Sequence, residues 1–382
     1  MHLRLLLLAT TTTALLPPQH AKHRHTTAYL TPVEKALASG DAESVVTALE
    51  DTTTDLSRTL AAACLDRACA VAAAPDGSGA AAALRSEEDR LARCYEALRA
   101  RGLASRYGVG ITRPWPVTRR GVTPEFIAAR TRNLTLASFR PSEGAGPLWW
   151  VLGSVLSIAE ILLSKKLGMD SPQPLFLGTA ALVLADQVAF KGAVGETVAA
   201  AANSEYSERI VRHEAGHVLL AYLLGCPVQG CVLSAREALA DDRAAALNGA
   251  AGTAFFDAEL NAAARSGAIK RSVLDRYTIV VMGGIAAEAM CYGDSQGGKD
   301  DEGALIQFLQ ETVGGFLGSD DPAGEVANQA RWAALNGLLL LRDHRAEFDR
   351  LVAALEATRA RSIGTVMLAI EDGATPLEAL AA

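Results

Sequence analysis

The sequence predicts a mainly α-helical protein with a small β-sheet, and two observations lead to this fold class. Apolar residues recur with helical period along most of the chain. Of the 382 residues 50% are hydrophobic, which suffices to bury a substantial core in about two or three domains. Strand character is confined to residues 229–234 and 251–256, and both segments are short.

Net charge and cysteine usage argue against a nucleic-acid-binding protein and against a disulfide-stabilised protein. The formal charge of -7 is spread without long acidic blocks, whereas nucleic-acid-binding proteins usually carry a basic domain, so we expect no nucleic-acid partner. The six cysteines form no CxxC pair, and a chain of this length does not need disulfide bonds. We therefore expect buried free thiols.

Residues 1–33 have the composition of a targeting leader. Arg4 precedes an apolar run at residues 5–16, which ends at Pro17 and Pro18 as a signal peptide would. Residues 19–33 contain no acid and several threonines, as transit peptides do. The combination predicts a bipartite leader and a plastid destination, and the alternative is the secretory pathway.

Residues 34–107 are rich in alanine and leucine with helical period, which predicts a helical N-terminal module of three or four helices. Thr31 and Pro32 are expected to be the N-cap and the first residue of its first helix. Residues 108–146 contain six arginines and are expected to form a basic linker or loosely draped segment. Its charge suits either anionic lipid or a solvated surface.

Residues 147–192 contain two apolar segments, 147–163 and 174–190. Each has about seventeen residues, fewer than the twenty that a membrane crossing needs, and each includes an acid, Glu160 or Asp186. A membrane hairpin, helices buried in the core, and helices lying on a membrane surface all remain open. In the last case Trp149-Trp150 would be the interfacial anchor.

The motif His213-Glu214-Ala215-Gly216-His217 lies in the remaining domain, residues 193–382. Helical period places residues four apart on one face, so both imidazoles can bind one Zn²⁺. Zinc lowers the pKa of a bound water to about 7, and Glu214 is placed to take its proton as general base.

Histidine usage favours a metal site over a chance match. Four of the seven histidines lie in the leader, which leaves His213, His217 and His344 for the rest of the chain. Two surface histidines on an amphipathic helix would be the ordinary alternative. The apolar residues around the motif, such as Val211 and Val218, argue against it.

Two known families of zinc peptidase do not account for the third zinc ligand of this chain. Metzincins require a histidine where this chain has Leu223. Intramembrane zinc peptidases require further spanning helices as well as an Asp-Gly ligand pair downstream, and the sequence after His217 contains no further apolar segment long enough to span a membrane.

Segments downstream of the motif provide a better match. Residues 283–288 are Gly-Gly-Ile-Ala-Ala-Glu, residues 292–293 are Tyr-Gly, and residues 297–301 are Gly-Gly-Lys-Asp-Asp. This ordered set resembles the peptidase domain of the FtsH-type membrane proteases, in which a Gly-Gly-Arg-Ala-Ala-Glu-Glu stretch and a Gly-Ala-Ser-Asn-Asp segment recur. The resemblance, from about Glu208 to Ile370, implies a zincin-like FtsH-type fold with Asp301 as the third ligand.

The chain departs from the family pattern at Ile285, Ala289 and Lys299-Asp300. The last departure leaves Asp300 as an alternative to Asp301. Glu288 is a rival ligand by charge, although its expected role is to support a ligating histidine by a hydrogen bond.

The ATPase half of that family has no counterpart in this sequence. No GxxxxGK[ST] pattern occurs, and Lys299 is followed by an aspartate. The resemblance is therefore to the stand-alone FtsH-like peptidases of plants and algae, and we expect that the chain does not hydrolyse ATP by itself.

The expected function is that of a zinc-dependent metalloendopeptidase. Its cofactor is Zn²⁺ on His213, His217 and Asp301, and its catalytic base is Glu214. The expected partners are protein substrates that add to strand 251–256, a separate ATPase or further copies of the chain, and a membrane. Two alternatives stay open: the strand is ordinary core, and the chain is a catalytically inactive FtsH-like assembly or scaffold partner.

Overall fold

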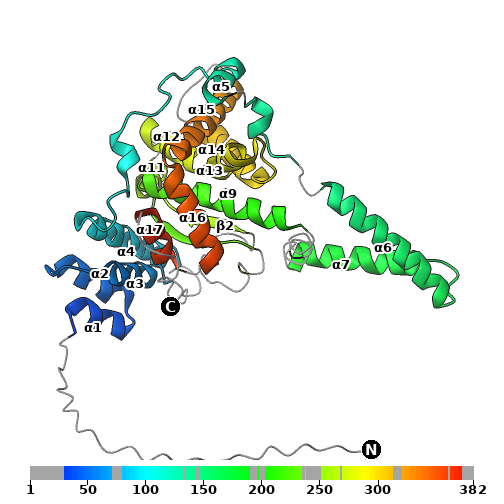
Figure 1. Cartoon of the computed structure of the whole chain (residues 1–382), viewed down its shortest axis with the longest axis horizontal. Coiled ribbons are helices and arrows are strands. Elements are labelled where there is room, and N and C mark those ends of the chain that lie inside the picture. Colours follow the sequence, from blue (N-terminus) through cyan, green and yellow to red (C-terminus); the bar gives the residue numbers. More distant parts are fainter. Residues whose placement is uncertain are drawn as a thin grey trace, which may run out of the picture.

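The computed structural model describes residues 30–70, 80–132, 134–142, 146–189, 203–234, 251–266, 269–312, 321–359 and 362–371, with Thr197 and Glu237 as single positions. The described part is mainly helical and contains one two-stranded antiparallel sheet, as the sequence predicts (Figure 1). The predicted leader lies almost entirely outside the described residues.

Helices form the N-terminal part of the described chain: α1 Pro32–Ser39, α2 Ala42–Asp51, α3 Arg58–Ala68 and α4 Ala80–Ala100. Thr31 is the N-cap of α1 and Pro32 its first residue, which confirms the sequence prediction. The Thr31 hydroxyl accepts a hydrogen bond from the Glu34 N–H, and the Glu34 carboxylate accepts one from the Thr31 N–H. This reciprocal capping satisfies two N–H groups that the first turn of a helix leaves free.

The segment expected as a basic linker is anchored to the body. It contains η1 Val109–Thr112, α5 Pro124–Thr131 and η2 Leu136–Phe139, and it packs on α15 Pro322–Asp343. Asn336 accepts a hydrogen bond from the Val117 N–H, and the Trp332 indole donates one to the Val117 carbonyl, both at 2.9 Å. Arg120 forms an ion pair with Asp275. The segment is therefore packed and not loosely draped, because side chains from other elements satisfy its backbone.

The two apolar segments form a helical hairpin, α6 Gly146–Lys166 and α7 Gln173–Ala189, which projects from the body (Figure 1). Apolar side chains of the hairpin such as Leu162 and Leu182 are exposed, so these are not core helices. Among the described residues, no helix has both the length and the hydropathy that a membrane crossing requires. The side chains of Trp149 and Trp150 lie outside the description.

The motif lies on α9 Ser204–Leu223. The other elements of this part of the chain are β1 Val228–Val232, β2 Gly252–Phe255, α11 Ala258–Ser266, α12 Arg271–Val281, α13 Gly283–Tyr292, α14 Lys299–Thr312, α16 Arg345–Thr358 and α17 Ile363–Glu371. Strands β1 and β2 pair antiparallel, with Cys231 opposite Thr253. They coincide with the two predicted strands to within two residues.

One hydrophobic core joins the N-terminal helices to α9. The ring of Tyr107 stacks on Tyr95 with centroids 4.6 Å apart, and it meets Tyr222 of α9 at 5.5 Å. The Tyr95 hydroxyl donates a hydrogen bond of 3.1 Å to the Val228 carbonyl at the start of β1. All six cysteines are free and all but Cys291 are buried, as predicted.

Candidate metal centre

Helix α9 brings the two motif histidines together. The Asn203 side chain caps its first turn by accepting a hydrogen bond from the Glu205 N–H. Further along, the four-residue spacing sets His213 and His217 on one face, where both are buried. Their Nε2 atoms lie 3.2 Å apart.

The third group of the cluster comes from the first turn of α14, where an acidic side chain also favours the helix electrostatically. Asp301 Oδ2 lies 2.9 Å from His213 Nε2 and 3.3 Å from His217 Nε2. Asp300 is exposed and is not part of this donor set. The structure thus brings together His213, His217 and Asp301, and it leaves Asp300 out.

The separations of the three donor atoms fit a zinc ion. Bonds of about 2.0–2.1 Å in a tetrahedral zinc site place neighbouring ligand atoms about 3.3 Å apart. The separations here are 2.9, 3.2 and 3.3 Å. Two imidazoles and one carboxylate are also a donor set typical of catalytic zinc, which uses three protein ligands.

Hydrogen bonds on the far side of each imidazole determine which nitrogen carries the proton. His213 Nδ1 lies 2.8 Å from Glu288 Oε1, and His217 Nδ1 lies 2.9 Å from the Val280 carbonyl oxygen. Both oxygens are acceptors, so both Nδ1 atoms donate, and each ring in its neutral form presents its lone pair at Nε2. In that form two lone pairs and a carboxylate oxygen converge, and they repel one another unless a proton or a metal ion lies between them.

Glu288, on α13, is buried but fully supported as an anion. Its carboxylate accepts hydrogen bonds from the N–H groups of Gln296 and Gly297, at 2.9 and 3.0 Å, and from Arg209 at 3.4 Å. Burial alone would raise the pKa of Glu288, but its hydrogen bonds with His213 and these backbone groups lower it below the ordinary value. Glu288 therefore holds the ring of His213 by a hydrogen bond to Nδ1. It is not one of the three donor groups His213, His217 and Asp301, which form a donor triangle.

The pKa shifts of the three clustered side chains also show that a positive charge between them is favourable. Burial opposes protonation of His213, yet its hydrogen bonds with Asp301 and Glu288 raise its pKa to about 10. Burial likewise opposes protonation of His217, and the charge of Asp301 outweighs it, so that pKa is also raised. Burial would raise the pKa of Asp301, but the two histidines hold it well below its usual range. A proton or a metal ion can supply this positive charge.

Glu214 lies between the two histidines in sequence but outside their donor set. Burial raises the pKa of its carboxyl above the ordinary value. Its Oε2 accepts a 2.8 Å hydrogen bond from the hydroxyl of Thr253, which is partly exposed on β2. The acid is therefore held in one orientation beside the cluster.

Glycines allow α13 to approach the motif helix closely. A Cβ on Gly216 would overlap the carbonyl oxygen of Gly283, and a Cβ on Gly284 would overlap the ring of His213. The Gly283-Gly284 pair, recognised in the sequence as part of a pattern, thus has a steric reason: only hydrogen atoms fit between these backbones and the imidazole.

Several residues around the site were missed in the sequence. Arg209 lies four positions before His213, so helical spacing could have indicated it. Thr253 and the Val280 carbonyl had no such signal, because they meet the motif only through tertiary packing. His344, the remaining described histidine, is the N-cap of α16 and not part of the cluster.

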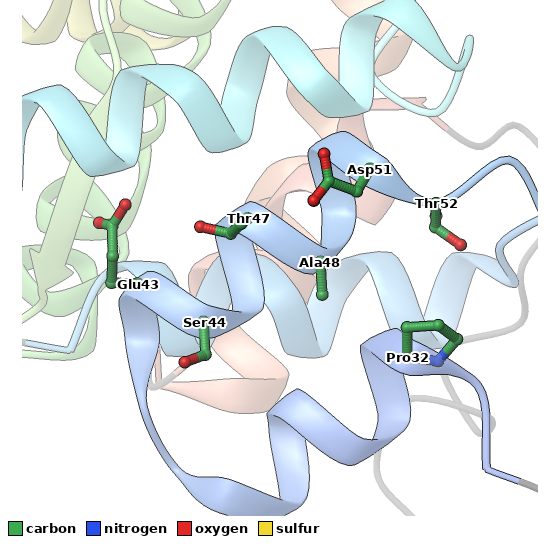
Figure 2. Close-up of a pocket in the computed structure, with 7 residues that line it drawn as sticks. All are labelled: Pro32, Glu43, Ser44, Thr47, Ala48, Asp51 and Thr52. Carbon is green, nitrogen blue, oxygen red and sulfur yellow. The ribbon is translucent and has the colours of Figure 1, made fainter.

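A separate hollow of about 440 Å³ lies on the N-terminal helices. Figure 2 shows its lining, which comes from the start of α1 and from α2 and includes Glu43, Thr47 and Asp51. Glu43 is engaged in an ion pair with Arg93, and the hollow shares no residue with the histidine cluster.

Comparison with known proteins identifies no relative. No model of a protein family matches the chain, and no curated protein or solved structure matches it significantly.

Proposed function

We propose that the chain is a zinc-dependent metalloendopeptidase with a zincin-like, FtsH-type peptidase domain. The observation that carries the proposal is the convergence of the two imidazole Nε2 atoms and one carboxylate oxygen on one point. His213, His217 and Asp301 would hold the ion. Zinc bound there supplies a Lewis acid that polarises a peptide carbonyl and makes water a better nucleophile.

Glu214 is the proposed general base. It takes a proton from the attacking water and returns it to the leaving amine nitrogen. Its raised pKa suits both steps, and its hydrogen bond with Thr253 supports a fixed orientation. Glu288 keeps His213 in the ligating tautomer, through the contact at 2.8 Å.

Strand β2 is the proposed binding edge for an extended substrate. In the described residues it pairs with β1 along one edge, and the sheet contains no strand beyond it. Thr253 links this strand to Glu214, so a peptide added to β2 by main-chain hydrogen bonds would run close to the base. The substrates are proteins, and a separate ATPase or further copies of the chain would deliver them.

Zinc content and cleavage of an unfolded protein test the proposal. The full chain should bind about one zinc ion, and Glu214→Gln should keep the metal while lowering cleavage about 100-fold or more. Glu208→Gln is the matched control, because Glu208 lies on the same helix with its carboxylate half exposed. A zinc-free wild type, or equal cleavage by wild type and Glu214→Gln, would favour the inactive assembly partner instead.

A plastid location completes the proposal and rests on the leader sequence alone. Fusing residues 1–33 to a fluorescent protein tests it. Accumulation in plastids supports it, and export through the secretory pathway contradicts it.

A further inference from the structure

The α6–α7 hairpin has the reverse of the polarity expected for two helices in water. Its most buried described side chains are polar: Glu160 is 8% exposed and Ser164 is 3% exposed. Leu162 is 61% exposed and Leu182 is 73% exposed. Helix pairs in water bury their apolar faces, so this arrangement is costly unless the surroundings are themselves apolar.

Polar side chains of the hairpin find their hydrogen-bond partners within the hairpin. The Thr179 hydroxyl of α7 donates to the Glu160 carboxylate of α6. The hydroxyls of Ser164 and Ser157 donate at 2.8 Å to the carbonyls of Ile161 and Gly153 on their own helix. Lipid offers no hydrogen-bond partner, so polar groups that satisfy one another in this way are what a lipid environment requires.

The exposed apolar residues point to more than one side. Residues 161–163 are all apolar and exposed, and so are residues 182–184. Three consecutive helical positions spread over more than half of a helix circumference, at about 3.6 residues per turn. A protein partner covers one face of a hairpin, whereas acyl chains surround it.

Basic residues mark the end of α6. Lys165 and Lys166 are both exposed there, next to the turn that joins the helices. Such a pair is complementary to the phosphates of anionic headgroups, which long lysine side chains can reach from an apolar helix.

We propose that the α6–α7 hairpin lies among the acyl chains of a lipid bilayer. The Glu160–Thr179 hydrogen bond shields the one acid of α6, and Lys165 and Lys166 contact anionic headgroups. This property does not depend on the metal centre and holds whether or not the chain is a peptidase.

Flotation with vesicles tests the proposal on the full chain, synthesised in the presence of phosphatidylcholine alone or mixed with anionic phosphatidylglycerol. The wild type should float with both, and more with the anionic vesicles. Leu162→Glu combined with Leu182→Glu should reduce flotation about tenfold or more. Leu84→Glu is the matched control, because Leu84 is a 52% exposed leucine on α4, and it should float like the wild type.

Two further variants test the details. The double variant Lys165→Glu with Lys166→Glu should show no preference for anionic vesicles. Each replaced lysine should lower binding to those vesicles about fivefold. Thr179→Val should reduce flotation because it leaves Glu160 unpaired in lipid. A wild type that floats with neither vesicle, or a Leu162/Leu182 variant that floats like the wild type, overturns the proposal. Another contrary outcome is a wild type that forms dimers without lipid and fails to float. If the Leu162/Leu182 variant dissociated such dimers, a second copy of the chain would be what covers the hairpin.

Discussion

The hydroxyl of Thr253 donates a 2.8 Å hydrogen bond to Oε2 of Glu214, which ties β2 to the acid between the two motif histidines. Thr253→Val keeps the shape of the side chain and removes this donor. We expect kcat to fall about tenfold with KM and zinc content unchanged, because the proposed base, Glu214, would no longer be held in one orientation. Steady-state kinetics on a peptide substrate measures this.

Thr253→Ser is the control, because it restores the hydroxyl and should restore kcat. A Thr253→Val variant with the kcat of the wild type would rule out the positioning role. The peptidase proposal itself would still stand if Glu214→Gln is inactive.

Adjacent aspartates provide a second test. Asp301→Asn should weaken zinc binding about 100-fold or more, because it replaces the anionic member of the donor triangle. Asp300→Asn, one position away and exposed, should bind zinc like the wild type. Zinc affinity measured by competition with a chelating dye distinguishes the two, and the reverse result would assign the ligand to Asp300.

The raised pKa of His213, about 10 in the metal-free protein, sets a pH dependence. Protonated His213 stabilises the metal-free fold. This stabilisation is complete below pH 6.5, the ordinary pKa of histidine, and is lost as the pH rises through about 10. Zinc bound at the proposed site would displace the same proton, so its affinity should increase over this range. The difference in Tm between zinc-loaded and chelator-treated protein should therefore widen from pH 6.5 upwards.

His344→Gln should show the same widening, because His344 is not part of the cluster. A difference in Tm that stays constant with pH would show that zinc does not displace a proton from this cluster.

Glycine 284 provides a steric test. Gly284→Ala should displace the His213 ring, since the added methyl group would occupy its position, and zinc affinity should fall about tenfold or more. Gly303→Ala, on α14 with open space at its Cβ, is the matched control and should leave zinc binding unchanged. Equal zinc binding by both variants would contradict the close packing of α13 on α9.

Local patterns predicted much of the fold and of the site. The N-cap at Thr31 and the two strands follow from local rules, and their positions agree with the structure. The facing histidines follow from helical period alone. The meeting of Asp301 with them was expected only from the resemblance of the downstream segments to FtsH-type peptidases, and in the structure Asp301 Oδ2 lies 2.9 and 3.3 Å from their Nε2 atoms.

Tertiary contacts explain what the sequence could not predict. The bond between Thr253 and Glu214 depends on how the sheet lies across α9, and the Val280 carbonyl depends on where α12 ends beside His217. Arginines at residues 108–146 suggested a loose linker, whereas Asn336 and Trp332 anchor that segment from α15. Likewise, composition could not show that Glu160 points inward against Thr179.

The ring contacts of Tyr107, which stacks on Tyr95 and meets Tyr222 edge-on, make the N-terminal helices part of the support for the motif helix. Because one apolar core runs through both, heat or denaturant should melt them in one cooperative transition, with no stable fragment left that retains the imidazole pair. Amide protons of α4 and α9 would then exchange only through the same global opening. Any cleavage or mutation that destabilises the first hundred residues would thereby disturb the candidate metal centre without contacting it.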